Sequence, residues 1–318
     1  MPLRCAILDD YQNVALSLAD WSKLKDDLEI KVFNEHLGSS EKVAAALKGF
    51  AVVCAMRERT AFPRAVIAAL PELKLLITTG MRNASIDLDA ARARGVVVCG
   101  TPSFGNATAA IAVGLMLDLA RHMSYESARL KAGVPWQTTI GLDLEGMTLA
   151  VLGLGKLGGH VAQIGQAFRM KTIAWSENLT PDRCKELGVE YVSRDDLFRG
   201  ADFLSIHLQL SPRTRGLIGA RELGLMKPSA YLINTSRGPI VDEAALITAL
   251  REKRIAGAGL DVFDMEPLPV DHPLRKLGNV VLTPHLGYVV EQNLRTFYTG
   301  TIEDIRAFLD GKPMRVLT

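Results

Sequence analysis

The stretch TLAVLGLGKLGGHVAQIGQAF, residues 148–168, decides the fold of this 318-residue chain. It opens with the apolar run TLAVLG (148–153), which has the character of a buried strand. It closes with a segment in which apolar residues recur at helical spacing. Between the two, Gly153, Gly155 and Gly158 form the pattern GxGxxG. We therefore expect a strand, a tight turn and a helix in direct succession.

In this context the glycines predict a binding site for the pyrophosphate of a dinucleotide. Gly153 permits the tight turn, Gly155 lets the backbone approach the phosphates, and Gly158 lets the helix pack close to the strand. Amide groups at the start of the helix, near Lys156 and Leu157, would face the anion. A strand-to-helix turn without a ligand is the alternative, and the flanking strand and helix argue against it.

The end of the next strand bears on the choice between NAD and NADP. An Asp or Glu about 20 residues beyond the glycines usually holds the ribose hydroxyls of the adenosine. Here the strand KTIAW (171–175) is followed by Ser176 and then Glu177. With Ser176 in that position, no carboxylate repels a 2′-phosphate and NADP is admissible; if Glu177 points inward, NAD is preferred. We predict NAD or NADP, with a slight preference for NADP.

Short apolar runs alternate with helical patterns on both sides of this motif. The runs lack polar alternation, as expected of parallel strands that are covered on both faces. This order predicts an α/β protein with two doubly wound parallel sheets. We expect strands at 4–10, 29–34, 50–56, 73–80 and 95–100, and in a second series at 148–153, 171–175, 203–208, 231–234, 258–263 and 280–285.

Three helical patterns add to this organisation. Residues 40–49 predict a helix with Ser40 as its N-cap. The apolar stretch 107–120 contains Asp118 and is shorter than the roughly 20 residues of a membrane span, so we expect a buried helix and no membrane partner. The final helix, 291–313, follows the last strand of the second series and could return to the first. We expect one domain from residues 1–101 and 286–318, and a nucleotide-binding domain from residues 102–285.

Composition and charge exclude several other classes of function. Lys and Arg number 37 against 35 Asp and Glu, a net charge of +2, and no basic tract favours nucleic acid. The start, MPLRCAILDD, is too short and too soon acidic for a signal peptide. The four cysteines form no CxxC pair and have no zinc-ligand spacing, so we expect no metal site and a reducing cytoplasm.

Three strand ends of the second series carry residues that suit reduction of a keto acid. They are Arg237 in NTSRG, Glu266 in GLDVFDMEPLP and His285 in VVLTPHLGY. Ligands of open α/β sheets bind beyond the carboxyl ends of the strands. An Arg can clamp a carboxylate, a His can donate a proton to a carbonyl oxygen, and a carboxylate can orient the imidazole. Each residue alone is more often solvated or packed, but together they predict one crevice.

These motifs resemble the D-isomer-specific 2-hydroxyacid dehydrogenases, which include phosphoglycerate dehydrogenases and glyoxylate/hydroxypyruvate reductases. The resemblance extends over nearly the whole chain and rests on VLGLGKLG, LINTSRGPIVDEAAL, AGLDVFDMEPLP and VVLTPHLGY in this order. It implies a Rossmann nucleotide-binding domain inserted into a flavodoxin-like substrate domain. It also implies a homodimer, for which segment 104–120 is an interface candidate.

The resemblance implies hydride transfer between NAD(P)H and a 2-keto acid. Arg237 would bind the substrate carboxylate and carbonyl, and Glu266 would pair with His285, the acid/base. Asp261 would hold the nicotinamide carboxamide, although on its own it is equally an ordinary turn residue. Other residues implied around the cofactor are Thr108, His207, Thr235 and Ser236. For His207, packing at a strand end is nearly as good an interpretation.

The chain departs from the family in its substrate loop, TTGMRNASID (78–87). The family has a glycine-rich loop, GxGxDxID, whose amides bind the substrate carboxylate. Here Gly80 is kept, but Arg82 replaces the second glycine and follows Met81. Arg82 either points to solvent or adds a cation to the pocket, which would suit a larger or doubly anionic substrate. Arg57, in AMRERT, matches a family position near the same loop.

Two other functions compete with a 2-ketoacid reductase. One is a non-catalytic nucleotide-sensing scaffold or corepressor of the same fold, because a fold does not fix a function. The intact set of Arg237, Glu266 and His285 favours the enzyme. The other is a formate- or phosphite-type dehydrogenase, for which the sequence offers no further polar pocket residues. The particular 2-hydroxy acid is left open.

Overall fold

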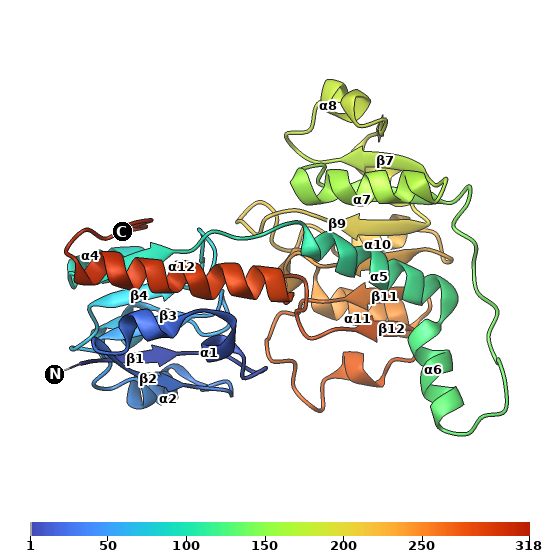
Figure 1. The fold of residues 1–318 in the computed structure, drawn as a ribbon. Coiled ribbons are helices and arrows are strands. Elements are labelled where there is room, and N and C mark those ends of the chain that lie inside the picture. The colour runs from blue at the N-terminus through green and yellow to red at the C-terminus, as the bar shows by residue number, and fades with distance from the viewer. Residues whose placement is uncertain (1) are drawn as a thin grey trace. The chain divides into compact units, whose positions relative to one another are not determined.

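The computed structural model describes residues 2–318, which form two compact units (Figure 1). Unit 1 runs to Gly105 and resumes at Val289, and unit 2 covers Asn106–Tyr288. The second unit is thus an insertion in the sequence of the first. The junctions lie a few residues beyond the boundaries expected at 101/102 and 285/286.

Unit 1 contains a five-stranded parallel sheet with the order β2-β1-β3-β4-β5. This is the flavodoxin-like order, in which the direction of winding reverses between β1 and β3. The strands are short and almost wholly apolar, because both faces of the sheet are covered. Their bounds are Leu3–Ile7 (β1), Leu28–Val32 (β2), Val52–Ala55 (β3), Leu75–Thr78 (β4) and Val97–Gly100 (β5).

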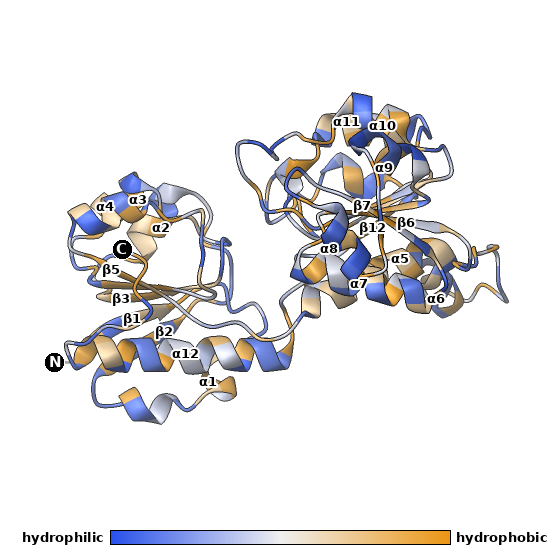
Figure 2. Ribbon diagram, turned by 90° about the horizontal axis from the view of Figure 1, so that it is seen from above, coloured by the Kyte–Doolittle hydropathy of each residue, from blue (hydrophilic) through white to orange (hydrophobic). Residues whose placement is uncertain are grey.

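Helices cover both faces of this sheet (Figure 2). One face packs against α2 (Ser40–Ala46), α3 (Arg64–Ala68) and α4 (Leu88–Ala93), around a core that includes Val53 and Leu76. The other lies against α12 (Glu291–Leu309), which packs beside β4 and beside α1 (Ala15–Leu18) and the 3-10 helix η1 (Trp21–Leu24). The chain therefore returns to unit 1 through α12.

Unit 2 contains a seven-stranded parallel sheet with the order β12-β11-β10-β9-β6-β7-β8. The chain winds outward from β6 in one direction and then from β9 in the other, so the switch point lies between β6 and β9. Ligands of open α/β sheets bind at such points. The strands are Thr148–Leu152 (β6), Lys171–Trp175 (β7), Glu190–Tyr191 (β8), Phe203–Ile206 (β9), Tyr231–Asn234 (β10), Gly257–Leu260 (β11) and Val280–Leu282 (β12).

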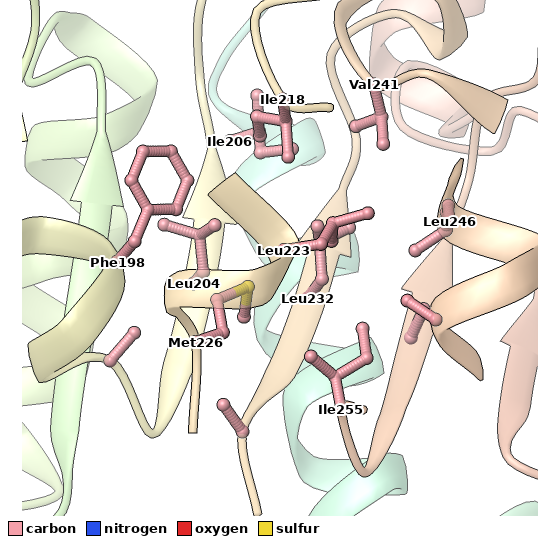
Figure 3. Close-up of a cluster of buried hydrophobic side chains, with 14 of the residues drawn as sticks. Phe198, Leu204, Ile206, Ile218, Leu223, Met226, Leu232, Val241, Leu246 and Ile255 are labelled. Carbon is pink, nitrogen blue, oxygen red and sulfur yellow. The ribbon is translucent and has the colours of Figure 1, made fainter. Parts of the chain in front are cut away.

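Two apolar clusters fill the space between this sheet and its helices. One face packs against α9 (Arg194–Gly200), α10 (Ala220–Leu225) and α11 (Glu243–Arg251), and Figure 3 shows Phe198, Leu223 and Leu246 from these helices pointing toward Leu204 and Leu232 of the strands. The other face packs against α5 (Ala107–Arg121) and α7 (Lys156–Ala167). The remaining elements are α6 (Met123–Lys131), α8 (Pro181–Glu186), η2 (Gly238–Ile240) and η3 (Pro273–Lys276).

The expected strands are all present, but several ends were wrong. The strand expected at 258–263 ends at Leu260, because the Asp261 side chain turns to bind the loop after β12. The strand expected at 280–285 ends at Leu282. The helix expected over 291–313 ends at Leu309, because Gly311 adopts φ +73° and stops it. The N-cap of α2 is Ser39, and Ser40 is its first helical residue. The two-residue strand β8 was not foreseen.

Several expectations concern absences. Within residues 2–318, no helix is long and apolar enough to span a membrane. The same part of the chain contains no group of His, Cys, Asp and Glu that could hold a metal ion. All four cysteines are free and buried.

Candidate functional site

The glycine turn after β6 is built as the motif predicts. Gly153 has φ +101°, and a Cβ on it would lie 2.8 Å from the carbonyl oxygen of His207. A Cβ on Gly158 would lie 2.0 Å from the carbonyl oxygen of Gly153, so α7 packs directly on the turn. A Cβ on Gly155, in contrast, would meet nothing within 4 Å. Two of the glycines therefore serve packing, and the third faces open space.

The start of α7 fits a phosphate group. Gly155 is the N-cap, no side chain caps the helix, and its first turn contains no acidic residue. Its first amides are left for a ligand, and the helix dipole favours an anion there. Lys156 is exposed and Leu157 is half-buried beside these amides. The open space at Gly155 and the uncapped helix start fit the pyrophosphate of NAD(P)H. The nicotinamide of this cofactor would supply the hydride.

The two residues considered for ribose binding, Ser176 and Glu177, both lie just beyond β7. Ser176 directly follows β7 and is half-buried, whereas Glu177 is exposed. The carbonyl oxygen of Trp175, at the end of the same strand, accepts a hydrogen bond from the Gly153 amide at 3.0 Å. The end of β7 is thus fixed beside the glycine turn, and Ser176 is the first side chain beyond it.

Arg237 sits on a turn that a buried Asn holds. The Asn234 side chain accepts from the Ser236 amide at 3.0 Å and donates to the Arg237 carbonyl oxygen at 2.9 Å. The Ser236 hydroxyl donates to the carbonyl oxygen of Ile206 on β9 at 2.7 Å. Sequence reasoning missed Asn234, although an Asn at a strand end is a known turn former. Arg237 therefore follows a hydrogen-bonded turn at the end of β10, and its Nη1 donates to the Ser236 carbonyl oxygen at 2.7 Å.

The Arg237 turn packs directly on the loop that carries Glu266. A Cβ on Gly238 would lie 2.1 Å from the carbonyl carbon of Phe263, so only glycine permits this approach. The Glu266 side chain folds back within its loop and accepts from the Phe263 amide at 2.9 Å. The backbone segments that follow β10 and β11 are therefore in direct packing contact.

Glu266 and His285 form a direct pair across neighbouring strand ends. Glu266 Oε2 lies 2.6 Å from His285 Nδ1, with the side chains 29% and 18% exposed, respectively. His285 adopts φ +52°, and the ring of Tyr288 packs edge-on against it with centroids 5.4 Å apart. Because the carboxylate occupies Nδ1, the imidazole presents Nε2 as its reactive nitrogen. The structure thus pairs Glu266 with His285, and the turn of Arg237 packs on the loop that carries Glu266.

Asp261 anchors the loop that carries His285. It is fully buried, and Oδ1 accepts from the Thr283 hydroxyl at 2.6 Å and from the Leu286 amide at 2.7 Å. Oδ2 accepts from the Gly287 amide at 2.8 Å. Burial raises the pKa of this carboxyl above its usual range, against the opposing effect of these bonds. A carboxylate has about four acceptor positions, so these three bonds use most of its capacity.

Thr108, near the start of α5, contacts the same loop. Its hydroxyl donates to the carbonyl oxygen of Gly287 at 3.0 Å. A Cβ on Gly287 would lie 3.1 Å from both Thr108 Cγ2 and Asp261 Oδ2, so the loop is held tightly between them. Sequence reasoning placed Thr108 near the nicotinamide, and the structure shows it beside Asp261.

Two buried polar atoms face the end of the sheet without a partner in the described part of the chain. They are Nδ1 of His207, after β9, and Oγ1 of Thr235, after β10. The other nitrogen of His207, Nε2, lies 2.8 Å from the hydroxyl of Ser205, and burial lowers the pKa of the imidazole to about 4. Buried polar groups rarely stay unpaired. Both atoms therefore suit contact with a bound ligand.

In unit 1, the residues expected to bind substrate lie on the loops after β3 and β4. Gly80 adopts φ +84°, and a Cβ there would lie 1.9 Å from Nη1 of Arg57. The Arg57 amide donates to the Thr79 hydroxyl at 2.9 Å. The Gly80 amide donates to the hydroxyl of Thr101 at 3.0 Å. Gly80 thus lets the Arg57 guanidinium approach, and its own amide is already bonded within unit 1.

Asn83 fixes the rest of this loop and was also missed by sequence reasoning. Its amide nitrogen donates to the carbonyl oxygen of Arg57 at 2.6 Å and to the Thr78 hydroxyl at 2.9 Å. Its oxygen accepts from the amide of Ser85 at 2.9 Å. Met81 and Arg82, just before it, are exposed. The loop is therefore ordered around Arg57 while presenting two large side chains outward.

Comparison with known proteins relates this geometry to one family. The protein-family model described as "D-isomer specific 2-hydroxyacid dehydrogenase, NAD binding domain" matches residues 113–287 of this chain. A glyoxylate reductase of Aeropyrum pernix is 41% identical over 256 residues, which are 78% of this chain and 76% of that protein. A D-3-phosphoglycerate dehydrogenase of Synechocystis sp. is 39% identical over 264 residues, 82% of this chain. The match covers only 47% of that longer dehydrogenase.

Two solved structures resemble the fold of this protein over nearly its whole length. A phosphoglycerate oxidoreductase from Vibrio cholerae has a TM-score of 0.92 at 33% identity, with 97% of this chain and 99% of that one covered. The D-lactate dehydrogenase of Escherichia coli has a TM-score of 0.85 at 26% identity, with 99% and 100% covered. Both comparisons confirm the expected pair of parallel-sheet units. The chain is a member of the D-isomer specific 2-hydroxyacid dehydrogenase family of NAD-binding oxidoreductases.

Proposed function

We propose that this protein is a 2-ketoacid reductase that transfers a hydride from NAD(P)H to a 2-keto acid and yields a D-2-hydroxy acid. The observation that carries the proposal is the 2.6 Å pair of Glu266 and His285 at strand ends that adjoin the Arg237 turn. This set provides a proton donor, a carboxylate that orients it and a cation for the substrate. A scaffold that only senses nucleotide would not need all three.

Each residue has a defined task in this reaction. Arg237 binds the substrate carboxylate and polarises the carbonyl as negative charge develops on its oxygen. His285 donates the Nε2 proton to that oxygen while the carbonyl carbon accepts the hydride. Glu266 holds the ring by Nδ1 and stabilises the imidazolium that starts the reaction. In the reverse direction His285 accepts the hydroxyl proton.

The cofactor would lie along the carboxyl ends of the unit 2 strands. Gly153, Gly155, Lys156, Leu157 and Gly158 would hold the pyrophosphate at the start of α7. Toward the nicotinamide, the contacts would come from the fourth acceptor position of Asp261 and from Thr108, His207, Thr235 and Ser236. Because Ser176 brings no negative charge to the ribose-binding position, we propose NADP over NAD.

We further propose that the loop of unit 1 that contains Gly80, Met81 and Arg82 binds substrate, with Arg57 behind it. The relatives named above reduce glyoxylate or oxidise phosphoglycerate, as their names state. A small 2-keto acid is therefore the substrate class, and Arg82 would add affinity for a second anionic group. We accordingly assign unit 1 to the substrate and unit 2 to the cofactor.

A homodimer would form through α6 and the segment after it. No residue of α6 is buried, and Trp136 and Ile140 in the following segment are 72% and 94% exposed. Glu126 on α6 accepts from the amides of Thr138 and Thr139, which fixes the segment on the helix. In segment 104–120, the other candidate, seven residues of α5 are buried in unit 2. Light scattering of Trp136→Ser against the unchanged protein tests this assignment. We place the protein in the cytoplasm, where free thiols persist.

The test of the function is a set of initial rates with purified protein. NADH and NADPH are each combined with glyoxylate, hydroxypyruvate, pyruvate, phenylpyruvate and 2-ketoglutarate, and loss of the reduced cofactor is followed by absorbance. We expect turnover with at least one keto acid and a higher kcat/KM with NADPH. Tight cofactor binding without turnover of any pair would favour the scaffold.

A further inference from the structure

One guanidinium ties the end of the chain to the last helix of unit 1. Arg315 donates from Nε to Asp304 Oδ1 at 2.8 Å, from Nη1 to Glu303 Oε2 at 2.9 Å and from Nη2 to the Gly300 carbonyl oxygen at 2.8 Å. Asp304 is fully buried and Arg315 is only 19% exposed. Such shielded, charge-assisted bonds are stronger than a surface ion pair. They also hold Arg315 at φ +52°, which a non-glycine residue rarely adopts.

The residues around Arg315 are bonded to the last strand of the sheet. The Gly100 amide donates to the Arg315 carbonyl oxygen at 3.0 Å, and the Leu317 amide donates to the Val98 carbonyl oxygen at 2.7 Å. Between these bonds, Val316 forms an antiparallel bridge with Cys99. Residues 315–317 therefore run antiparallel along β5.

The end of β5 in turn supports the candidate substrate loop. A Cβ on Gly100 would lie 2.8 Å from the Gly80 carbonyl oxygen and 3.1 Å from Met81 Cα, with Leu317 Cδ1 at 3.3 Å. The Thr101 hydroxyl accepts from the Gly80 amide. Gly80 and Met81 therefore rest directly on Gly100 and Thr101.

The helix that Arg315 holds also touches this support. A Cβ on Gly300 of α12 would lie 3.1 Å from Thr101 Cβ, so the helix backbone packs closely against Thr101. Gly300 is also the residue whose carbonyl oxygen accepts from Arg315. The guanidinium thus connects α12, the end of the chain and β5 at the place where the substrate loop rests.

We propose that Arg315 is a positioning residue for the substrate loop: it fixes α12 and the chain end behind Gly100 and Thr101, and thereby fixes the backbone of Met81 and Arg82. This inference rests on the proposed function. Arg315 would touch neither substrate nor cofactor. Because a misplacement of about 1 Å can reduce the efficiency of a bound reaction by about a hundredfold, a loosened loop should weaken substrate binding.

Arg315→Met tests the proposal, because Met keeps an apolar stem without the guanidinium. We expect the KM for the keto acid to rise about tenfold while the KM for NAD(P)H and the circular dichroism stay unchanged. Arg315→Lys should restore part of the substrate affinity. Arg306→Met is the matched control, since Arg306 also joins α12 to another segment of unit 1, through Asp27 and the Lys23 carbonyl oxygen. Its kinetic constants should match those of the unchanged protein.

Hydrogen exchange of residues 79–83 gives a second readout that does not depend on catalysis. Exchange should be faster in Arg315→Met than in Arg306→Met. If Arg315→Met does not fold, Leu317→Ala removes the side chain that lies nearest the Cβ position of Gly100 and should give the same pattern. An unchanged keto-acid KM with unchanged exchange would overturn the proposal, as would an equal rise in the KM of the cofactor. An unchanged protein that reduces no keto acid would overturn the proposed function instead, and the exchange comparison would still decide the role of Arg315.

Discussion

Replacing Glu266 with Gln removes one negative charge from the pair with His285 and keeps the size of the side chain. The 2.6 Å contact to His285 Nδ1 is a charge-assisted hydrogen bond between partly buried groups. Hydrogen bonds to charged groups contribute about 1.5–3 kcal/mol. Because each 1.36 kcal/mol changes a rate tenfold, kcat should fall about 10- to 150-fold. The bond from the Phe263 amide to Oε1 can be kept by the Gln carbonyl, so the loop should stay in place.

The assay is steady-state reduction of the best keto acid by NAD(P)H. The loss should appear in kcat with little change in the substrate KM, because the imidazolium matters most as charge develops in the transition state. The protein contains a matched control, since Glu243 Oε1 lies 3.1 Å from His272 Nε2 in the same unit. Glu243→Gln is the same substitution in a second His–Glu pair. Equal kinetics for the two variants, or a fall of less than about threefold for Glu266→Gln, would refute the reasoning.

Three further predictions follow from the glycine turn, the ribose-binding position and a buried acid. Gly158→Ala should lower the melting temperature by several degrees because its Cβ would meet the Gly153 carbonyl oxygen at 2.0 Å, whereas Gly155→Ala should leave it unchanged and raise the cofactor KM; calorimetry and kinetics separate the two, and equal melting temperatures would count against the packing argument. Ser176→Asp should reduce kcat/KM with NADPH at least tenfold relative to NADH, as a carboxylate repels the 2′-phosphate, and an unchanged ratio of the two cofactors would remove Ser176 from the ribose-binding position. Burial raises the pKa of Asp304 from 3.8 to about 6, so the folded state binds a proton more tightly than the unfolded state; stability from this group is present below pH 4 and is lost, by at most about 3 kcal/mol, as pH rises through 6. The free energy of unfolding of Asp304→Asn, measured with urea at several pH values, should lack this decrease with pH. An identical decrease would assign the pH dependence to other groups.

The fold could be predicted because its signals are local. Apolar runs without polar alternation marked nearly every strand, and the glycine pattern after residues 148–152 located the nucleotide turn. The strand end at Leu260 was wrong because Asp261 leaves the ladder to bind Leu286 and Gly287, which are remote in sequence. An apolar pattern records burial and does not record such long-range bonds.

The difference between local and long-range signals also explains which residues of the candidate site could be predicted. Arg237, Glu266 and His285 stood out because their side chains are unusual at the ends of apolar strands. Asn234 and Asn83 did not, since a short polar residue in a loop has many interpretations until its partners are known. Arg315 gave no local signal, because its role depends on contacts with α12 and β5.

The central claim is tested most directly by the rate and the product of one reaction, carried out by the unchanged protein and by His285→Ala. Reduced cofactor is incubated with each protein and with the fastest-reduced keto acid that yields a chiral product (hydroxypyruvate, pyruvate, phenylpyruvate or 2-ketoglutarate, since glyoxylate gives achiral glycolate). The hydroxy acid is then resolved by chiral chromatography. The account predicts the D-enantiomer from the unchanged protein and a loss of at least a thousandfold in kcat for His285→Ala, since proton donation and the pairing with Glu266 are lost together. Formation of the L-enantiomer, or a His285→Ala variant that keeps its rate, would contradict the account.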